Sequence, residues 1–221
     1  MAIDETLMEF QGDPWAVPSL RFYTWSSPSL TVGYFQNVEE AARRFRCREL
    51  KTEVARRLTG GGAVFHGSDL TFSLTMKIPN ALIAGDVKNS YLKINEALMA
   101  GLKVIYPGLD FADCRTVPSS RGAKSAQRIC FETPSCYDLL LDGKKVVGAS
   151  QRRRDGSLLH QSAVFLRGEP LELQKLIVDG FRKKWSVEFV EKNLTPDEFK
   201  KAEILEGQRY RSPEWALNVR H

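Results

Sequence analysis

A run of three glycines beside two arginines is the first segment whose residues suggest chemistry. Arg56 and Arg57 precede glycines 60–62, and His66 closes the segment. Glycine loses the most backbone entropy on folding, so three in a row favour a loop that approaches a ligand closely. Arginine can bind a phosphate or carboxylate through two parallel hydrogen bonds. A flexible turn with solvated arginines fits the same residues, and the nucleotide motifs GxxxxGK[ST] and GxGxxG are both absent.

A thiol is the second candidate. Cys130 opens the segment Cys-Phe-Glu-Thr-Pro-Ser, with Lys124 and Arg128 upstream and Lys144 and Lys145 after the next turn. Nearby cations favour the nucleophilic thiolate over the thiol, whose ordinary pKa is about 8.5. Cys130 is therefore either a nucleophile or a small buried hydrophobe. Burial is also the expectation for Cys47, Cys114 and Cys136, because the chain has no CxxC pair and no metal-ligand spacing.

The third candidate segment runs from 143 to 160. Its small residues 148–150 would let a substrate lie against the backbone. Arginines 152–154 predict either a solvated turn or a patch that contacts an anion. His160 lies beside an apolar pair, so it is either a hydrogen-bonded core histidine or a second site histidine besides His66.

Composition limits the class of protein. The 221 residues, 43% of them hydrophobic, predict one domain that can bury its core without a disulfide or metal. The net charge of +5 suits an acidic partner or simple solubility, and no aromatic-interleaved basic repeat supports nucleic-acid binding. No apolar run is long enough for a membrane helix, and the acidic start is unlike a secretory signal. A cytoplasmic protein is expected.

Strands and helices alternate along the chain, with several hairpins, and predict one α/β domain with a mixed sheet. Asp142-Gly143 predicts a hairpin turn, and Ser90 and Thr195 are expected to cap helices, the latter in a capping box with Glu198. A polar loop is expected over 116–128. Helices are predicted over 3–10, 38–45, 90–102, 171–181 and from 195, and strands over 20–25, 29–35, 53–59, 63–66, 70–78, 137–141, 145–147 and 163–166.

Five segments, in order, resemble the lipoyl/octanoyl transferase and lipoate–protein ligase A family, whose catalytic domain is also similar to that of biotin–protein ligases. They are Met-Ala-Ile-Asp-Glu at 1–5, Leu-Arg-Phe-Tyr-x-Trp at 20–25, Val-Gly-Tyr-Phe-Gln at 32–36, Arg-Arg-Leu-Thr-Gly-Gly-Gly-Ala-Val at 56–64 and Lys-Lys-Val-Val-Gly-Ala-Ser-Gln at 144–151. The resemblance implies a single catalytic domain over 1–221, without a C-terminal accessory domain. Its sheet would be mixed, mostly antiparallel and flanked by helices, as in biotin/lipoyl protein ligases.

Cys130-Phe-Glu-x-Pro-Ser resembles the nucleophile segment of LipM-type octanoyltransferases, which implies that Cys130 carries an octanoyl thioester. Lys145 matches the active-site lysine of the family. The chain departs from the family at Gly67, where Asp is common, and at residues 160–162, which read His-Gln-Ser rather than His-Gly-Ser. The resemblance implies these substrate-binding residues: Arg57, Thr59, Gly60, Gly61, Gly62, Ala63, His66, Gly148, Ala149, Ser150 and His160.

The implied function is octanoyl transfer in lipoate biosynthesis. Octanoyl would pass from acyl carrier protein, through the Cys130 thioester, to a lysine on a lipoyl domain of a 2-oxoacid dehydrogenase or of the glycine cleavage H protein. This route needs no cofactor and no metal. One alternative is an ATP-dependent lipoate–protein ligase domain, which would use ATP and Mg and need a separate accessory domain. Another is a non-catalytic protein that binds an acyl group or its carrier.

Overall fold

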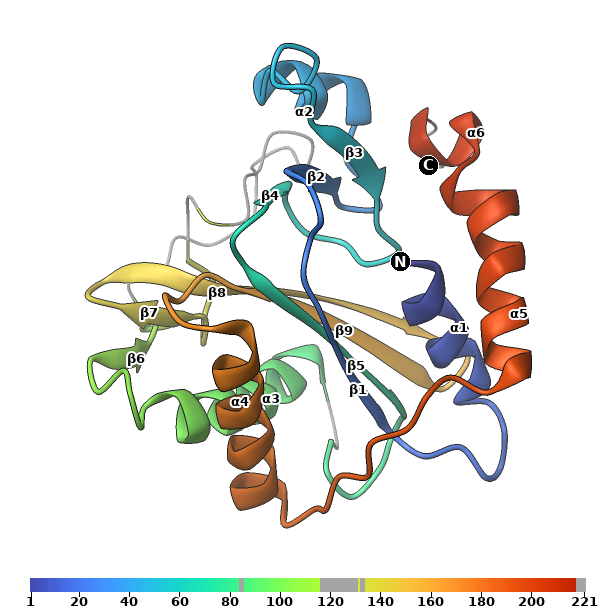
Figure 1. The fold of residues 1–221 in the computed structure, drawn as a ribbon. Helices are drawn as coiled ribbons and strands as arrows, with labels where there is room; N and C mark the ends of the chain where they lie inside the picture. Colours follow the sequence, from blue (N-terminus) through green and yellow to red (C-terminus); the bar gives the residue numbers. More distant parts are fainter. Residues whose placement is uncertain (84–85, 116–130, 132–133, 218–221) are drawn as a thin grey trace.

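Two β-sheets form the centre of the computed structural model, which describes residues 1–83, 86–115, 131 and 134–217 (Figure 1). In the larger sheet every neighbouring pair is antiparallel. Its strands lie in the order β1 (Ser19–Tyr23), β5 (Leu70–Lys77), β9 (Ser157–Val164), β8 (Lys144–Arg154), β7 (Leu139–Leu141) and β6 (Leu109–Phe111). In the smaller sheet β2 (Ser29–Val32) runs parallel to β3 (Glu53–Arg56) and antiparallel to β4 (Val64–His66). The predicted mixed, mostly antiparallel arrangement is confirmed, divided over two sheets.

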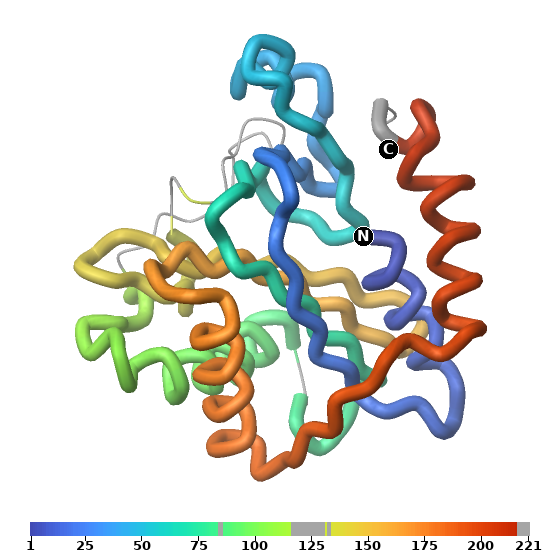
Figure 2. The backbone as a smooth tube through the Cα atoms, in the orientation of Figure 1, coloured from blue at the N-terminus to red at the C-terminus, as the bar shows by residue number. Residues whose placement is uncertain are grey.

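Helices cover both faces of the six-stranded sheet. On one face α3 (Val87–Leu102) packs against α4 (Pro170–Trp185), and both helices join the main apolar core. We call this side the helix face. On the other face α1 (Ala2–Phe10) contacts β5 and β9, and α5 (Pro196–Leu205) lies along α1 although 185 residues separate them in sequence (Figure 2). The chain also forms α2 (Val38–Arg44), η2 (Glu206–Tyr210), which is a π-helix, and α6 (Pro213–Leu217).

Alternation along the strands sends neighbouring side chains to opposite faces. On β9, Leu158 belongs to the core beneath α3 and α4, whereas Leu159 packs against Met8 of α1. The next pair repeats the pattern. His160 lies against Phe72 and Tyr91 on the helix face, and Gln161 bonds to Asp4 of α1.

Local turn and cap chemistry follows the sequence at most positions. Asp142-Gly143 forms the hairpin turn with φ of 51° and 76°, and the capping box at Thr195 is present. The prediction that Ser90 is an N-cap is wrong: Asp86 accepts the capping bond from the backbone of Asn89, and Ser90 lies inside the first turn.

The arginine segment 152–154 is a strand and not a solvated turn. It ends β8, and its side chains are half-buried. Arg153 donates to Ser90 and Arg154 to Glu9. The turn into β9 comes at a second Asp-Gly pair, Asp155-Gly156, with φ of 51° and 71°, so β9 starts six residues before the predicted strand.

Two of the cysteines form a disulfide, against the expectation that both would be buried packing residues. Cys114 and Cys136 are bonded across 22 positions of sequence. They follow β6 and precede β7, which pair with each other, so the strand pairing brings the two thiols together. Cys47 is free and buried as expected. Cys130 and the predicted loop over 116–128 lie outside the described residues.

No helix in the described ranges is both long and apolar enough to cross a membrane.

Candidate functional site

A narrow cleft opens where the small sheet meets β8 and β9. Its volume is about 30 Å³. Five of the predicted substrate-binding residues line it: Arg57, His66, Gly148, Ala149 and Ser150. Three come from β8, and the other two flank the glycine loop, so the fold brings the first and third candidate segments together. We call the side of the large sheet that carries this cleft and α1 the cleft face.

Arg57 shapes the glycine loop from inside. Its guanidinium is buried and donates to the carbonyl oxygens of Gly60 and Gly62, each at 2.7 Å. It also donates to the backbone oxygen and hydroxyl of Thr31. Arg57 is thus not a solvated side chain, and anion binding by its guanidinium stays a prediction.

Two positions in this region require glycine. Gly61 has φ of 88°, and a Cβ at Gly33 would stand 2.1 Å from the carbonyl oxygen of Gly61. Side chains rarely tolerate the first and cannot occupy the second. Gly61 also lies beside Arg57 and Ser150, two residues that line the cleft.

His66 is held on both ring nitrogens. Nδ1 lies 2.8 Å from Oδ2 of Asp69, and Nε2 lies 2.9 Å from Oγ1 of Thr31. The ring stacks on Trp25 at 4.1 Å between centroids. With both nitrogens engaged, His66 braces the wall of the cleft and does not present a base to it.

Asp69 binds both His66 and the backbone of Gly67. Its carboxylate accepts from the backbone N–H of Gly67 at 3.1 Å as well as from His66. Burial raises the pKa of Asp69, but the hydrogen bonds and the nearby imidazole outweigh burial and hold it below its ordinary value. Asp69 is therefore a carboxylate that fixes the ring of His66 on the side away from Thr31.

A line of short hydrogen bonds runs from the cleft to α1. Ser150 Oγ donates to Thr59 Oγ1 at 2.8 Å, and Thr59 Oγ1 donates to Gln161 Oε1 at 2.7 Å. Gln161 Nε2 donates to Oδ2 of Asp4 at 2.7 Å. Thr59 thus contacts the cleft wall through Ser150.

Asp4 is fully buried and accepts four hydrogen bonds. Besides Gln161, the donors are Arg21, Tyr23 and Ser73. Burial raises the pKa of the Asp4 carboxyl, but the N-terminal ammonium, Arg21 and the donated hydrogen bonds hold it below its ordinary value. Asp4 is therefore an anion at neutral pH.

Lys145 forms a buried ion pair with Asp138. Nζ lies 2.6 Å from Oδ2, and the two side chains are only 4% and 7% exposed. Asp138 also accepts from the backbone N–H of Ser135. The Lys145 ammonium lies 5.4 Å from the ring centroid of Phe131, the sequence neighbour of Cys130.

A β-bulge aims Lys145. Leu139 pairs with Val147, but Leu140 pairs with Lys145, so β8 carries one extra residue at this point. Cross-strand partners share a face, and Leu139 and Val147 belong to the core on the helix face. Lys145 therefore turns to the cleft face, on the same strand as the residues that line the cleft.

Two predicted residues lie away from the cleft. Ala63 is part of the apolar cluster that holds Leu30, Val32 and Val38. His160 is fully buried on the helix face, and its ring nitrogens lie 3.0 Å from Gln151 Nε2 and 2.8 Å from Ser162 Oγ. Burial lowers the pKa of His160 to about 3, so it is a neutral core histidine.

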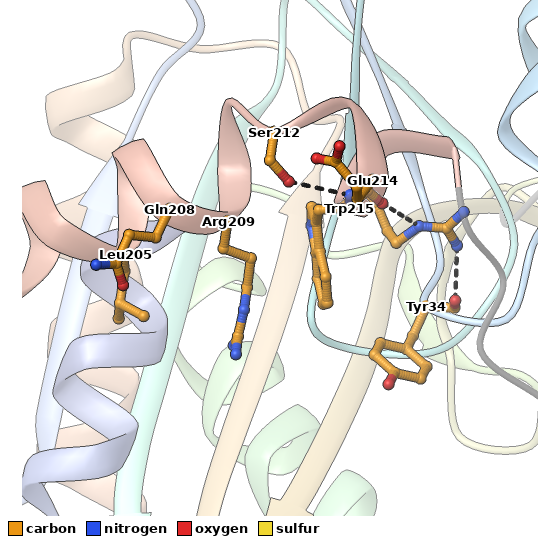
Figure 3. Close-up of a pocket in the computed structure, with 8 residues that line it drawn as sticks. Tyr34, Leu205, Gln208, Arg209, Ser212, Glu214 and Trp215 are labelled. Atoms are coloured by element: carbon orange, nitrogen blue, oxygen red, sulfur yellow. Dashed lines mark hydrogen bonds between the residues drawn. The ribbon is translucent and has the colours of Figure 1, made fainter.

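A larger cavity of about 400 Å³ lies beneath η2 and α6 (Figure 3). The side chain of Arg56 donates to the carbonyl oxygens of Tyr34 and Trp215, and the Trp215 indole donates to the Arg56 carbonyl. Arg209 binds the buried carboxylate of Glu5. The charged groups that line this cavity thus join the C-terminal helices to the rest of the protein.

Asp4, Gln161 and Asp138 are not among the residues that the sequence predicts for the site. Asp4 lies within the family segment at 1–5 and Gln161 at a departure from the family pattern, but neither pattern indicates a role. Asp138 comes immediately before the predicted hairpin that carries Lys145, so hairpin pairing was the available indication. No group of three or more potential metal ligands occurs within the described ranges.

Comparisons with known proteins point to one family. The sequence profile of the lipoyl protein ligase A/B catalytic domain matches residues 1–205. The chain is 40% identical over 167 residues to octanoyltransferase LipM of Carboxydothermus hydrogenoformans, a match that covers 76% of this chain and 60% of that protein. It is 28% identical to the LipM of Bacillus anthracis, covering 97% of this chain and 92% of that protein.

Solved structures show the same fold. Lipoate-protein ligase A bound with ATP matches with a TM-score of 0.81 and 23% identity, covering 99% of this chain and 93% of that one. A T. acidophilum bipartite lipoate protein ligase, studied with its E2 lipoyl domain, matches with a TM-score of 0.76 and 22% identity, covering 100% and 91%.

Proposed function

Because the chain belongs to the lipoyl protein ligase A/B catalytic domain family, we propose that it is an octanoyltransferase of lipoate biosynthesis. The similarity to LipM proteins supports this reaction, although the chain spans only 60% of the length of the first of these relatives. One structural observation supports it most directly. A buried ammonium, Lys145, lies against Phe131, the residue next to the proposed nucleophile Cys130.

The proposed reaction has two acyl-transfer steps. The Cys130 thiolate attacks the carbonyl carbon of an octanoyl thioester on acyl carrier protein, the bond from that carbon to the carrier sulfur breaks, and the carrier leaves as a thiol after taking a proton. The ε-amine of a lysine on a lipoyl domain then attacks the enzyme thioester. An amide forms, and Cys130 leaves with the proton lost by the amine. Conversion of a thioester to an amide is downhill, so the proposal requires neither ATP nor a metal.

Lys145 has the properties of an electrostatic stabiliser in both steps. Its ammonium has only donors, and its partner Asp138 fixes it in a largely water-excluded position. A donor fixed in this way can stabilise the negative charge that develops on the acyl oxygen, without reorganisation during the reaction. Its charge would also favour the Cys130 thiolate over the thiol.

The proposed partners are protein carriers. Acyl carrier protein as donor and lipoyl domains as acceptors fit the net charge of +5 if their own surfaces are acidic, because complementary charge speeds encounter. A cytoplasmic location remains part of the proposal. Since disulfides are rare in that compartment, it predicts that Cys114 and Cys136 are reduced in the cell.

The test is a comparison of Cys130→Ser with Cys47→Ser, a second thiol that is free and buried elsewhere. We expect Cys130→Ser to lower octanoyl transfer to an apo lipoyl domain by about 10³-fold or more, and Cys47→Ser to retain it. Transfer that survives in Cys130→Ser would remove the proposed nucleophile. Attachment of free lipoate that requires ATP would instead identify a ligase.

A further inference from the structure

The hydrogen bonds between Asp4 and Ser150 all point the same way. Asp4 is fully buried and is surrounded by donors, among them Arg21 and Tyr23, so its carboxylate can only accept. Gln161 must therefore turn its NH₂ group toward Asp4, at 2.7 Å. This fixes which end of the Gln161 amide is oxygen, a choice that the hydrogen-bond network has to decide.

The orientation of Gln161 then fixes the direction of the hydrogen bonds made by the Thr59 and Ser150 hydroxyl groups. Because the amide nitrogen of Gln161 is bound to Asp4, its Oε1 is the atom that faces Thr59. The Thr59 hydroxyl donates its only hydrogen to this oxygen. Thr59 Oγ1 can then only accept from Ser150, whose hydroxyl hydrogen is used in turn. Each hydrogen bond in this series therefore has one possible direction, and the Asp4 carboxylate sets that direction.

Ser150 consequently presents only lone pairs to the cleft. A thioester carbonyl also has only lone pairs, so Ser150 cannot bind it. Lys145, on the same strand, is the opposite case because an ammonium has donors and no acceptor. Of these two β8 side chains, Lys145 thus suits a carbonyl oxygen and Ser150 suits an N–H group.

We propose that Ser150 Oγ is the binding site for the attacking primary amine, and that Asp4, Gln161 and Thr59 are positioning residues that keep Ser150 an acceptor. This inference rests on the proposed function and assigns the two steps of that function to different groups. Ser150 accepts one N–H of the neutral amine while the amine lone pair attacks the acyl carbon. Since Ser150 already donates to Thr59, the proton that the amine loses passes to the departing Cys130 sulfur and not to Ser150.

The two half-reactions separate this role from a structural one. Acyl-enzyme is formed with octanoyl-acyl carrier protein, freed of excess donor, and then mixed with an apo lipoyl domain. We expect Ser150→Ala and Thr59→Val to slow the second step by about 10-fold, the effect of one lost hydrogen bond, with a much smaller change in acylation. Thr59→Ser keeps the hydroxyl that Thr59→Val removes, so its second step should run near the wild-type rate.

Thr75→Val is the matched control. Thr75 lies on β5, and its buried hydroxyl has no partner among the residues that the structure describes. The same substitution there should leave both steps unchanged. Equal slowing of both steps in Ser150→Ala, or no rescue by Thr59→Ser, would overturn the assignment of Ser150 to the amine. Failure of the wild-type protein to form any acyl-enzyme would instead count against the proposed function.

Discussion

The two faces of the six-stranded sheet are buried by different kinds of contact. On the helix face α3 and α4 cover an apolar core, with Phe72, Leu98 and Phe181 fully enclosed. On the cleft face the fully buried residues include the carboxylates of Asp4 and Glu5, each tied to several donors. Apolar packing fixes shape but not the direction of a hydrogen bond, whereas the polar face fixes both. We infer that the cleft face carries the reaction and the helix face supports it.

The cleft that we assign to the reaction is much smaller than the other cavity of the protein described above. The cavity beneath η2 and α6 is about 400 Å³ and the cleft about 30 Å³. Only the cleft is lined by the small residues of β8 and by a hydroxyl that belongs to a directed chain of hydrogen bonds. Four predictions test the contrast between the two faces, from the largest expected effect to the smallest.

Breaking the ion pair on the cleft face should cost the most. Asp138→Ala removes the carboxylate that pairs with the buried Lys145 ammonium, and we expect a loss of about 3–5 kcal/mol in the free energy of unfolding, measured by urea denaturation. Asp179→Ala, which breaks an exposed pair with Arg182, should cost less than about 1 kcal/mol. Equal losses in the two variants would show that the Lys145 pair is not buried in solution.

The disulfide should stabilise the strands that hold Asp138. Cys136 lies two residues before Asp138, and Ala112 and Asp138 are joined by a backbone hydrogen bond. Reduction by a dithiol, or Cys114→Ser, should lower stability by about 2–4 kcal/mol in thermal or urea unfolding. The reductant should then have no further effect on Cys114→Ser. A wild-type protein indifferent to the reductant would contradict this role for the bond.

The helix face should be sensitive to added side-chain volume. A Cβ at Gly101 of α3 would stand 1.8 Å from the carbonyl oxygen of Leu176 in α4. We expect Gly101→Ala to force the helices apart and lower stability by about 1–3 kcal/mol, while octanoyl transfer per folded molecule stays near the wild-type rate.

Gly207→Ala is the control for this prediction, because none of the neighbouring atoms that the structure describes lies within 4 Å of the Cβ it would add. Its stability should remain close to that of the wild type. A Gly101→Ala protein that folds normally but loses transfer would show that the helix face takes part in catalysis.

The two faces should lose stability in different pH ranges. Burial lowers the pKa of His160 to about 3, below its unfolded value near 6.5, so the unfolded chain binds a proton that the folded protein refuses. Stability should therefore fall as the pH drops below about 6.5, by on the order of 1 kcal/mol per pH unit. Asp69 acts lower. Its pKa is held below 3.8, so its contribution is complete above that value and is lost as the pH falls further.

Urea titrations at several pH values distinguish the two groups. His160→Gln should flatten the loss between pH 6 and about 4.5, and Asp69→Asn should alter the slope only below about pH 4. If His160→Gln leaves the slope near pH 5 unchanged, the ring is not buried in its neutral form.

Features encoded by adjacent residues could be predicted from the sequence. The Asp142-Gly143 turn and the Thr195–Glu198 capping box depend on residues within one turn, and both are present. The Asp-Gly turn rule also applies to Asp155-Gly156. It predicts the second turn there, and it therefore predicts that the arginine segment before it is part of a strand. The family resemblance also indicated Arg57, His66 and Ser150 as site residues, and all three line one cleft.

Features that depend on distant partners could not be predicted in this way. The sequence does not show that the glycine loop brings two carbonyl oxygens to the Arg57 guanidinium. Cys114 meets Cys136, and Asp138 meets Lys145, only because β6, β7 and β8 pair in register. Ser150 becomes an acceptor only because Asp4, 146 residues earlier in the chain, is an anion at the end of its hydrogen bonds.

The formation of the acyl-enzyme is the central claim. The most direct measurement is the intact mass of the protein after incubation with octanoyl-acyl carrier protein, followed by peptide mapping of the modified residue. The proposed mechanism predicts the mass gain of one octanoyl group, on Cys130, that is sensitive to hydroxylamine and disappears when an apo lipoyl domain is added. An unmodified mass after full exposure to the donor, or an adduct on another residue, would contradict it.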